Sequence, residues 1–560
     1  MTNASNRKHL TGAQAIIATL RAYNVDTIFG IPGVHTLPIY DAIYHEPGLR
    51  HILARHEQGA GFMAEGYARI SGRPGVVCTI TGPGVTNVTT PAASAYADSV
   101  PLLVISSALS RATQGLNRGE LHEVKDQLGI MQALVGWTRA INYVEEIPEA
   151  IHDAFRVMYQ GRPRGAYLQI PYDLLLQTAD VTIPALDLWE RPLPAIEPLA
   201  AAVDVLREAQ RPLIIAGNGV TASGANQQLL QLAELLQAPV LLGSKSHDVL
   251  PTRHPLVIAT NDNLPLELDA FIATRDVVLV VGSKLGAERT AGGRLPLPDN
   301  LIHIDIDPME IGHAYRAQVG IVSDAKVALE TLFKLLKSYP MERTAPESAL
   351  ADLRETIYEY TLEFQGENLQ LLEGVRIALE QMPAETVVVA DMTMLGYAAA
   401  CYLPMRQPRT FIHPSELCTI GSGLPMALGA QLAIPGRPVI ALCGDGGFLL
   451  NSSELATAVQ EKIPVIVVIF NDATFTRVKT DQRTNYDKHY IATDLQAPDY
   501  LLLAQAFHAQ SMRAETAEAL SSAIKKASQH NGPTIIEVPL LPRQWDQRHT
   551  AEKQLTTLAQ

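Results

Sequence analysis

Cysteine is scarce in this chain of 560 residues, which contains four. No two of them form a C-x-x-C pair, so neither a disulfide framework nor a zinc site of the usual spacing is expected. Because this cysteine usage fits a reducing compartment, the sequence predicts a cytoplasmic protein. The four residues are Cys78, Cys401, Cys418 and Cys443.

Positive charge is also in deficit, with 44 Lys and Arg against 58 Asp and Glu and a formal net charge of −14. Binding along a nucleic acid or a lipid surface needs clustered cations, so neither partner is expected. A small-molecule substrate of either charge remains open, because a local pocket can oppose the sign of the net charge.

Long apolar runs are missing as well. No stretch of 18 or more apolar residues is free of charges and turn signals, so no membrane span is predicted. The first residues, MTNASNRKHLTGAQAI, are polar and lack the apolar segment of a signal peptide.

The sequence does contain ample core material, since 47% of its residues are hydrophobic and 18% are charged. Short β-branched runs alternate with helical patterns in three blocks, which is typical of parallel strands joined by crossover helices. We therefore predict an α/β fold of three consecutive domains, each with a mainly parallel sheet flanked by helices. The predicted domains span residues 1–187, 188–340 and 341–560, with a linker at 188–198 and a charged helical connector at 326–370.

The most specific motif lies in the third domain. A Gly-Asp-Gly-Gly motif at Asp445 follows the apolar run PVIALC, and a second apolar run, PVIVVIF, ends in an Asn-Asp pair at Asp472, 27 residues further on. Both acids fall at the carboxyl ends of neighbouring parallel strands, where open α/β sheets bind ligands. Glycines let a phosphate approach the backbone, and carboxylates can hold Mg²⁺ beside it. The plainer alternative is a generic turn at a strand end.

A second candidate lies in the first domain, in ARHEQGAGFMAEGYAR. Glu57 stands at a predicted helix start after the run HILA, and small residues follow it, which permits close helix packing. A carboxylate in a partly apolar setting can hydrogen-bond or protonate a ring nitrogen. The alternative is an ordinary glutamate favoured at a helix N-terminus by the helix dipole.

Taken together, these segments resemble the thiamine-diphosphate-dependent enzymes, and HEQGAxxMAEGYAR resembles the acetohydroxyacid synthases and their relatives. The resemblance covers nearly the whole chain and implies a pyrimidine-binding domain, a central Rossmann-like domain and a diphosphate-binding domain. It implies thiamine diphosphate and Mg²⁺ as cofactors. It makes Glu57 the glutamate that activates the aminopyrimidine ring.

The resemblance also assigns the remaining cofactor residues. The implied metal ligands are Asp445, Asp472 and the main-chain carbonyl of Thr474. Asp472 departs from the family's usual Asn, and its extra negative charge changes the metal site. For Ile420, which would lie beneath the bent cofactor, the alternative is plain core packing. The implied cofactor contacts are Glu57, Thr393, Met394, Cys418, Ile420, Gly444, Gly446 and Gly447.

In this family the active site lies between two subunits, which implies a homodimer or a homotetramer. Glu57 of one subunit would then act on the cofactor held by Asp445 of another. In the central block, GNGV at 217–220 and GSKLG at 282–286 are incomplete as nucleotide-binding motifs. We therefore interpret that block as mainly structural, with nucleotide binding left open.

Two histidines are candidate catalytic residues. His35 lies in IPGVHTLP, where synthases carry small residues, and His122 lies in GELHEVKDQ, near a cofactor-contacting Gln of the synthases. Both segments are more similar to 2-ketoarginine decarboxylase-like members, and His35 also to benzaldehyde lyase-like members. A histidine can relay protons near neutral pH. The alternative for each is a satisfied surface or helix-cap histidine.

The segment after Asp472 departs from the synthases, because it lacks their tryptophan and has Arg477 and Val478 in the corresponding region. The pocket glutamate and paired histidines of pyruvate decarboxylases are absent too. Arg477 could bind an anionic substrate group, which would make a guanidinium substrate doubtful, or it could be a solvated loop charge.

The expected activity is therefore thiamine-diphosphate-dependent decarboxylation of a 2-oxo acid, with carboligation to a second carbonyl compound left open. The alternatives are a lyase of 2-hydroxyketones, such as acyloins or benzoins, and an acetolactate synthase-like carboligase. A non-catalytic relative would need a damaged cofactor site, which Glu57 and Asp445 argue against.

Overall fold

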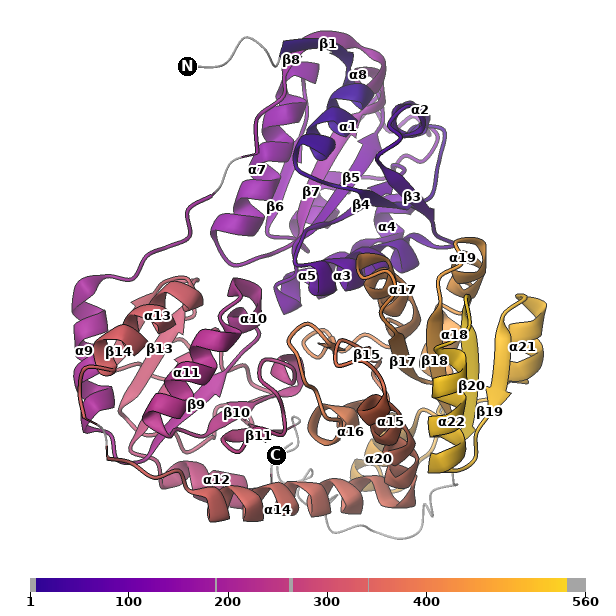
Figure 1. Cartoon of the computed structure of the whole chain (residues 1–560). Helices are drawn as coiled ribbons and strands as arrows, with labels where there is room; N and C mark the ends of the chain where they lie inside the picture. The colour runs from indigo at the N-terminus through magenta and orange to yellow at the C-terminus, as the bar shows by residue number, and fades with distance from the viewer. Residues whose placement is uncertain (1–6, 187–188, 261–264, 341, 541–560) are drawn as a thin grey trace. The chain divides into compact units, whose positions relative to one another are not determined.

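The computed structural model describes residues 7–186, 189–260, 265–340 and 342–540. Within these residues the chain forms three six-stranded sheets and one two-stranded antiparallel ribbon (Figure 1). The strand pairs of the large sheets run parallel, as the continuous apolar runs predict. The fold class is therefore confirmed. No helix among the described residues has the length and apolar character needed to cross a membrane.

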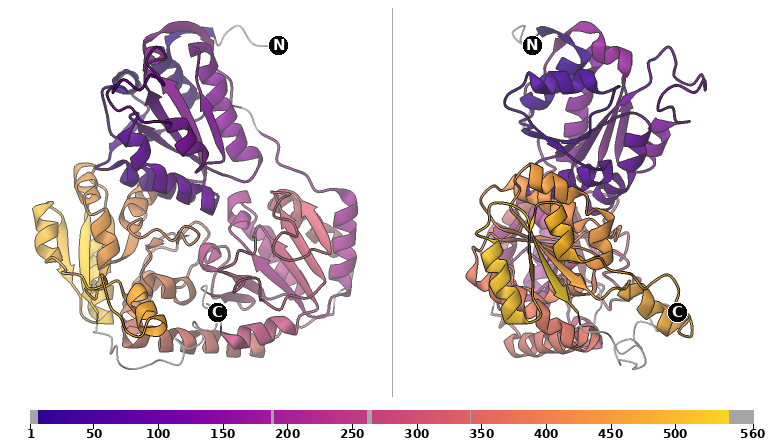
Figure 2. Two further views of the ribbon diagram at one scale, coloured as in Figure 1. Left: turned by 180° about the vertical axis from the view of Figure 1, so that it is seen from behind. Right: turned by 90° about the vertical axis from the view of Figure 1, so that its right-hand side faces the viewer.

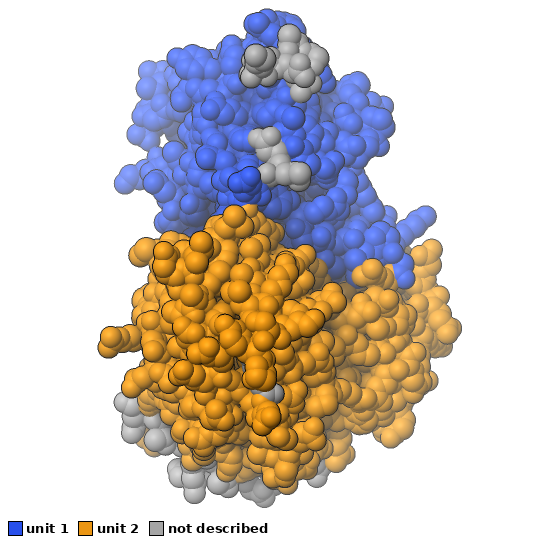
Figure 3. All heavy atoms as spheres, turned by 60° about the vertical axis from the view of Figure 1, so that its left-hand side comes forward, with its two compact units in different colours: residues 1–190, 414–436, 451–465 blue, residues 191–413, 437–450, 466–560 orange. Residues whose placement is uncertain are grey.

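The chain separates into two compact units, which Figure 3 shows in different colours. Unit 1 comprises Met1–Glu190, Pro414–Gly436 and Asn451–Val465, and unit 2 comprises the remaining three segments. The domain boundaries predicted at 187/188 and 340/341 involve Asp187, Leu188 and Met341, which lie outside the described residues, as does the start of the predicted linker. The three-domain division stays a prediction.

Unit 1 is built around a parallel sheet in the order β3-β2-β4-β5-β7-β6. Its strands are β2 (Thr27–Gly30), β3 (Arg50–Leu53), β4 (Gly75–Thr79), β5 (Leu102–Ala108), β6 (Trp137–Ala140) and β7 (Ala166–Pro171), and the ribbon pairs β1 (Arg7–Thr11) with β8 (Thr178–Thr182). Its helices are α1 (Gly12–Ala22), α2 (Leu37–Tyr44), α3 (Glu57–Ser71), α4 (Pro83–Asn87), α5 (Thr89–Asp98), α6 (Gln127–Gln132), α7 (Ile147–Gln160), α8 (Tyr172–Leu176), α17 (Gly423–Ala433) and α19 (Glu454–Gln460).

Helices cover both faces of this sheet (Figures 1 and 2). Val76 and Cys78 of β4 join the core cluster formed with α1 and α7, and strand alternation turns Val77 to the opposite face. On α3, a Cβ at Gly66 would lie 2.1 Å from the main-chain oxygen of Met426 on α17. The predicted close packing of this small-residue helix is therefore confirmed, with backbone against backbone.

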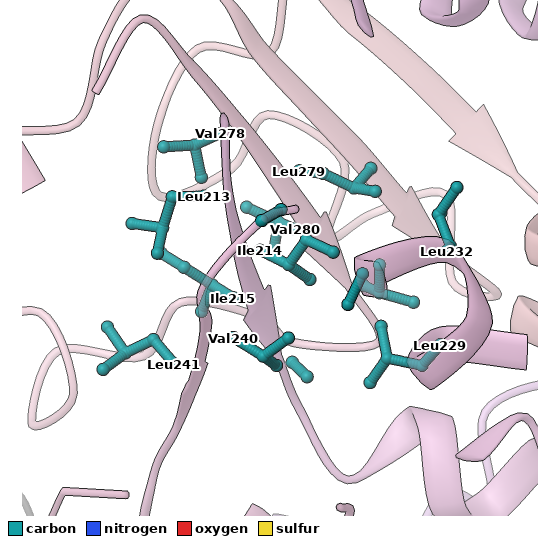
Figure 4. Close-up of a cluster of buried hydrophobic side chains, with 14 of the residues drawn as sticks. Leu213, Ile214, Ile215, Leu229, Leu232, Val240, Leu241, Val278, Leu279 and Val280 are labelled. Carbon is teal, nitrogen blue, oxygen red and sulfur yellow. The ribbon is translucent and has the colours of Figure 1, made fainter. Parts of the chain in front are cut away.

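The first sheet of unit 2 has the order β11-β10-β9-β12-β13-β14. Its strands are β9 (Pro212–Ala216), β10 (Val240–Leu242), β11 (Val257–Ala259), β12 (Val277–Val281), β13 (Leu301–Asp305) and β14 (Val319–Val322), and its helices are α9 (Ile196–Glu208), α10 (Gly219–Ser223), α11 (Asn226–Leu236), α12 (Leu266–Ala273) and α13 (Ala325–Leu336). Figure 4 shows Leu229 and Leu232 of α11 beside the strand side chains of Ile214 and Val280 in this core.

The two incomplete glycine motifs and the start of the predicted connector lie in this region. The main-chain N–H of Gly219 donates to the oxygen of Gly282 at 3.0 Å, and a Cβ at Gly217 would lie 2.1 Å from the same oxygen. The glycines of both incomplete motifs thus have a structural role, because the two turns touch. The predicted connector at 326–370 is wrong in its first part, because α13 buries Leu329 and Leu332 in the core of this sheet.

The second sheet of unit 2 has the order β16-β15-β17-β18-β20-β19. Its strands are β15 (Val387–Ala390), β16 (Phe411–Ile412), β17 (Val439–Gly444), β18 (Val465–Asn471), β19 (Gln510–Arg513) and β20 (Thr534–Pro539). The helices that follow in sequence are α14 (Glu347–Gln365), α15 (Leu369–Gln381), α16 (Met394–Tyr402), α18 (Asp445–Leu450), α20 (Thr476–Asn485), α21 (Tyr500–Ala506) and α22 (Ala517–Ala527). Because β17 and β18 are neighbours, Asp445 and Asp472 directly follow the ends of adjacent strands.

Candidate active site

Asp445 and Asp472 are brought to one edge of the sheet by the strands that precede them. Asp445 is the first residue of α18, directly after β17. Asp472 directly follows β18. The carboxyl ends of neighbouring parallel strands meet at one edge of a sheet, so the prediction from the sequence is confirmed for the positions of these two acids.

The electrostatics of this pair favour a cation. Burial, followed by the charge of Asp472, raises the pKa of Asp445 to about 6, although the N–H groups of Gly446 and Ala473 partly offset the effect. Oδ2 of Asp445 is buried and has no hydrogen-bond partner among the described residues. A divalent cation would satisfy this oxygen and neutralise both carboxylates, so the residues present fit Mg²⁺.

The loop after β18 is tightly constructed around the same acids. Thr476 donates a short hydrogen bond to the carboxylate of Asp472, and the hydroxyl of Thr474 donates to the oxygen of Thr493 at 2.8 Å. Ala473 has a φ of +54°, a conformation that non-glycine residues adopt at a cost of about 1 kcal/mol or more. Because the Thr474 hydroxyl is engaged, its main-chain carbonyl is the group left for the predicted metal contact.

Glycines of the motif make room for neighbouring side chains. A Cβ at Gly446 would lie 2.5 Å from the ring of Phe475. A Cβ at Gly444 would lie 3.1 Å from Oγ1 of Thr393, the N-cap of α16. Gly447 is also buried. The structure thus brings Thr393 beside the glycine motif, as the resemblance implies.

Met394 is placed differently from its neighbour. Its side chain is 6% exposed and packs against Phe364, so it serves the core. The main-chain N–H at this first position of α16 remains a candidate for an anionic group, since helix N-termini leave such donors unpaired.

Glu57 is the first residue of α3 and is 8% exposed. Nδ2 of Asn87, at the end of α4, donates to its Oε2 at 2.9 Å. A Cβ at Gly84 would lie 3.5 Å from the other oxygen, Oε1. The carboxylate is therefore fixed by a specific partner and keeps one oxygen available for a ligand, beyond what a helix dipole alone would require.

Cys418 and Ile420 lie in an irregular segment that precedes α17. Cys418 is exposed and has a φ of +52°, and its thiol donates to the oxygen of Ser415 at 2.8 Å. Ile420 is 37% exposed. The core-packing alternative for Ile420 is therefore wrong in this structure, and the residue is free to contact a ligand.

His35 and His122 lie together, although 87 residues separate them in sequence. Their ring centroids are 5.8 Å apart with the planes nearly perpendicular, and the ring of Tyr172 lies 5.5 Å from His35. Burial, followed by the charge of His122, lowers the pKa of His35, and its Nδ1 is buried without a partner among the described residues. A neutral histidine with an unsatisfied nitrogen is suited to take up or release a proton.

The main chain of His122 also lies against Gly82, at the start of α4. It has a φ of +65°, and a Cβ at Gly82 would lie 2.3 Å from its main-chain oxygen. Gly82 caps α4, the helix that ends in Asn87. The helix-cap alternative for His122 finds no support in this arrangement.

Arg477 and Val478 lie on α20, next to the metal-site loop. Val478 is 52% exposed. The guanidinium of Arg477 lies 3.5 Å from the carboxylate of Asp481, and both side chains are about two-fifths exposed. This face of α20 therefore carries both signs of charge, which the sequence reasoning did not consider for Asp481.

Two further residues of the site were not singled out from the sequence. Asn87 ends the segment TGPGVTN, and the sequence alone does not show that its side chain pairs with Glu57. Glu454 accepts hydrogen bonds from the main chain just before Glu57. It is about 400 residues away in sequence, and no local pattern reports such a contact.

Comparison with known proteins gives one consistent match. Residues 10–130 match the family described as "Thiamine pyrophosphate enzyme, N-terminal TPP binding domain", residues 199–332 match its central domain, and residues 391–538 match its C-terminal TPP binding domain. The matched segments include Glu57 and Asp445.

Three similar proteins are matched over 95% of this chain. A probable 2-ketoarginine decarboxylase of Pseudomonas aeruginosa is 37% identical, with 94% of its length covered. A probable acetolactate synthase large subunit of Methanocaldococcus jannaschii is 33% identical, with 92% covered. An acetolactate synthase of Mycobacterium bovis is 32% identical, with 88% covered.

Proposed function

The chain belongs to the thiamine-diphosphate-dependent enzymes, and from that premise we propose that it decarboxylates a 2-oxo acid. The observation that carries the proposal is the buried, unpartnered Oδ2 of Asp445 facing the charge of Asp472. Thiamine diphosphate, when bound, supplies the nucleophilic carbon and the electron sink that cleavage beside a carbonyl requires. Mg²⁺ is the usual metal of the family.

We propose that Asp445, Asp472 and the main-chain carbonyl of Thr474 hold Mg²⁺. The N–H groups at the start of α16 and the glycines of the Asp445 motif would receive the diphosphate oxygens, since both lie at helix N-termini after a strand. Cys418 and Ile420 are the candidates for contact with the rest of the cofactor. The exposure of Ile420 supports this assignment.

Glu57 is the proposed activating residue. Its carboxylate is anchored through Oε2 by Asn87, which leaves Oε1 to share or donate a proton at the ring nitrogen of the cofactor's aminopyrimidine. A buried carboxylate near a nitrogen base is an arrangement that moves a proton without solvent.

His35 and His122 are the proposed acid–base pair for the substrate. Because its pKa is lowered, His35 is neutral at neutral pH and can accept a proton at Nδ1. The ring of His122 contacts that of His35, with the centroids 5.8 Å apart, and His122 can pass that proton onward. Such a pair serves protonation of the carbon that loses CO₂.

The substrate class follows from the relatives and from α20. A 2-oxo acid with a guanidino group is the first to test, because the first of the three relatives above is a probable 2-ketoarginine decarboxylase. Arg477 alone would repel a guanidinium substrate. Because the carboxylate of Asp481 pairs with Arg477, the positive charge there is balanced and a cationic substrate is compatible with this helix. Arg477 remains the candidate for the substrate's own carboxylate.

Carboligation to a second carbonyl compound is the second candidate, supported by the acetolactate synthase relatives. The assembly proposed is a homodimer or homotetramer with active sites between subunits, on the resemblance alone. A cytoplasmic location is proposed because the sequence has four cysteines, none of them in a C-x-x-C pair, which fits a reducing compartment.

The test is release of CO₂ from a panel of 2-oxo acids with aliphatic, aromatic, acidic and guanidino side chains. We expect turnover of at least one member, dependent on both thiamine diphosphate and Mg²⁺, and greatest for the guanidino acid. Aldehyde as the product indicates decarboxylation, and a hydroxyketone or acetohydroxy acid indicates carboligation. Cleavage of benzoin or acetoin without turnover of any 2-oxo acid would overturn the proposal in favour of a lyase.

A further inference from the structure

Glu454, the first residue of α19, has a carboxylate that is fully buried against the chain immediately before Glu57. Its Oε1 accepts from the main-chain N–H of Arg55 and from that of His56, each at 3.0 Å. Its Oε2 lies 3.2 Å from the same Arg55 nitrogen and accepts from the hydroxyl of Thr457 at 2.7 Å. Both residues that it holds by the backbone directly precede the catalytic candidate.

The same helix holds the end of the preceding strand. The hydroxyl of Thr457 also lies 3.0 Å from the oxygen of Leu53, the last residue of β3. The guanidinium of Arg55 donates to Gln460 at 2.7 Å. Residues of α19 therefore fix the corner between β3 and α3. Among them, Glu454 is the one whose side chain accepts hydrogen bonds from the main-chain N–H groups of the corner.

The fit at this corner is close. A Cβ at Gly59, in the first turn of α3, would lie 2.2 Å from Oε1 of Glu454. No side chain larger than hydrogen fits at that position without moving the carboxylate. The start of α3 is thus held in two ways. Asn87 donates a hydrogen bond to the carboxylate of Glu57, whereas Glu454 binds the backbone just before Glu57 and packs against Gly59.

A carboxylate is a costly residue for this task if it only stabilises the fold. Burial raises the pKa of Glu454, and the hydrogen bonds from Thr457 and from the Arg55 and His56 amides, together with the positive charge of Arg55, only partly offset it. A buried charge costs several kcal/mol unless its partners compensate the lost hydration in full. What it gains is a strong, directional hold on two adjacent amide groups, because hydrogen bonds to ionised acceptors are short and about twice as strong.

We propose that Glu454 is a positioning residue, which fixes the backbone at Arg55 and His56 and thereby sets the orientation of the Glu57 carboxylate. The proposal rests on the proposed role of Glu57. Displacing a reacting group by about 1 Å can lower a rate about a hundredfold. Loss of the hold therefore lowers kcat, whereas KM changes little because the proposed substrate contacts lie elsewhere.

The test compares Glu454→Ala with Glu454→Gln and with Glu461→Ala. In Glu454→Gln, the amide oxygen can accept from both main-chain N–H groups, and the amide nitrogen can donate to Thr457, whose hydroxyl already has Leu53 as an acceptor. Glu461→Ala is the matched control, because Glu461 directly follows α19 and its carboxylate pairs at 3.1 Å with the guanidinium of Arg50, which lies at the other end of β3 from the corner. All variants are compared with thiamine diphosphate and Mg²⁺ saturating.

Two measurements decide the outcome. Steady-state kinetics should give a kcat for Glu454→Ala about tenfold to a hundredfold below wild type, with KM within about threefold. Glu454→Gln should recover most of that loss, and Glu461→Ala should match wild type. Amide hydrogen exchange of the 53–60 segment in cofactor-free protein should be faster in Glu454→Ala than in the other two.

Gly59→Ala covers the case in which Glu454→Ala does not fold. Alanine raises helix propensity by roughly 1 kcal/mol over glycine, yet its Cβ would displace the Glu454 carboxylate. We expect a stably folded variant with lowered kcat and faster exchange at 53–60. Gly59→Ala with wild-type kcat and exchange would overturn the proposal.

Wild-type kcat and unchanged exchange in a folded Glu454→Ala would likewise overturn it. Loss of kcat in Glu454→Gln equal to that in Glu454→Ala would show that the charge, not the positioning of the amides, matters. Glu57→Gln separates this failure from a failure of the proposed function. If Glu57→Gln retains turnover, the role of Glu57 is wrong, whereas if only Glu454→Ala retains it, the positioning role alone is wrong.

Discussion

Asp445 and Asp472 follow neighbouring strands, and burial together with the charge of Asp472 raises the pKa of Asp445 to about 6. The pair is unfavourable in the protein alone, because burial and the charge of Asp472 both disfavour the ionised form of Asp445. A divalent cation converts the same geometry into a favourable one. The electrostatic cost of holding the two carboxylates close together in the cofactor-free protein is therefore relieved when the cation binds, and this relief favours binding.

Asp445→Asn should stabilise the cofactor-free protein while abolishing Mg²⁺-dependent cofactor binding. The folded-state pKa is raised from 3.8 to about 6, so the folded chain retains a proton that the unfolded chain releases in that window. Stability of the cofactor-free protein consequently falls as pH rises from about 4 to about 6. The full penalty, on the order of 2–3 kcal/mol, applies above that window.

Denaturant unfolding of wild type and Asp445→Asn at pH 4.5, 6 and 7.5 checks this prediction. The free energy of unfolding of Asp445→Asn should not show the fall between about pH 4 and about pH 6. At pH 7.5 the variant should be more stable than wild type. Titration with thiamine diphosphate and Mg²⁺ should show weakened binding by wild type below about pH 6, because protons compete with the metal for Asp445. Equal cofactor affinity of the two proteins at pH 7.5 would contradict the assignment.

Gly446→Ala should damage the metal loop without removing any ligand. Its Cβ would lie 2.5 Å from the Phe475 ring and 3.0 Å from Leu495, and overpacking of this kind costs about 1–3 kcal/mol. We expect a lowered midpoint of thermal unfolding and weaker cofactor binding. Adding Phe475→Leu should restore both in part, and an additive double variant would show that the contact is not the cause.

His35→Gln should lower kcat by about a hundredfold or more, since general acid–base catalysis contributes about 10²–10⁴-fold. Because burial and His122 lower the pKa of His35, the acid limb of the wild-type rate profile should lie below the ordinary histidine value and should vanish in the variant. His45→Gln, at the exposed end of α2, is the control. A profile unchanged by His35→Gln would return the residue to a structural role.

Mixing two inactive variants tests whether active sites form between subunits. In random dimers of Glu57→Gln and Asp445→Asn chains, half the dimers contain one site built from two intact contributions, so about a quarter of wild-type activity should return. The measurement is CO₂ release after co-refolding, with each variant alone as the control. No recovered activity would place both residues on the same chain's site.

Local patterns identified most of this site because its residues follow strands and begin helices. The Gly-Asp-Gly-Gly motif, the Asn-Asp pair and the glutamate after HILA are read from strand ends and spacing, and the parallel sheets put Asp445 and Asp472 on adjacent strands. The resemblance added the roles. Met394 was assigned to the cofactor by position, but tertiary packing on Phe364 takes up its side chain.

Contacts between distant segments were beyond the sequence. The ring contact of His35 with His122 depends on how the loops after β2 and β5 fold over the sheet. The hold of Glu454 on Arg55 and His56 joins α19 to α3, and no periodicity encodes it. The pairing of Arg477 with Asp481, by contrast, is an i,i+4 helix pair that spacing could have predicted.

The most direct test of the account is the comparison of cofactor binding and turnover in Glu57→Gln. The substitution keeps the shape and the contact with Asn87 but removes the proton chemistry of the carboxyl group. We predict thiamine diphosphate affinity within about fivefold of wild type and CO₂ release at least about a hundredfold slower, since general acid–base groups contribute about 10²–10⁴-fold. Wild-type CO₂ release by Glu57→Gln would contradict the account.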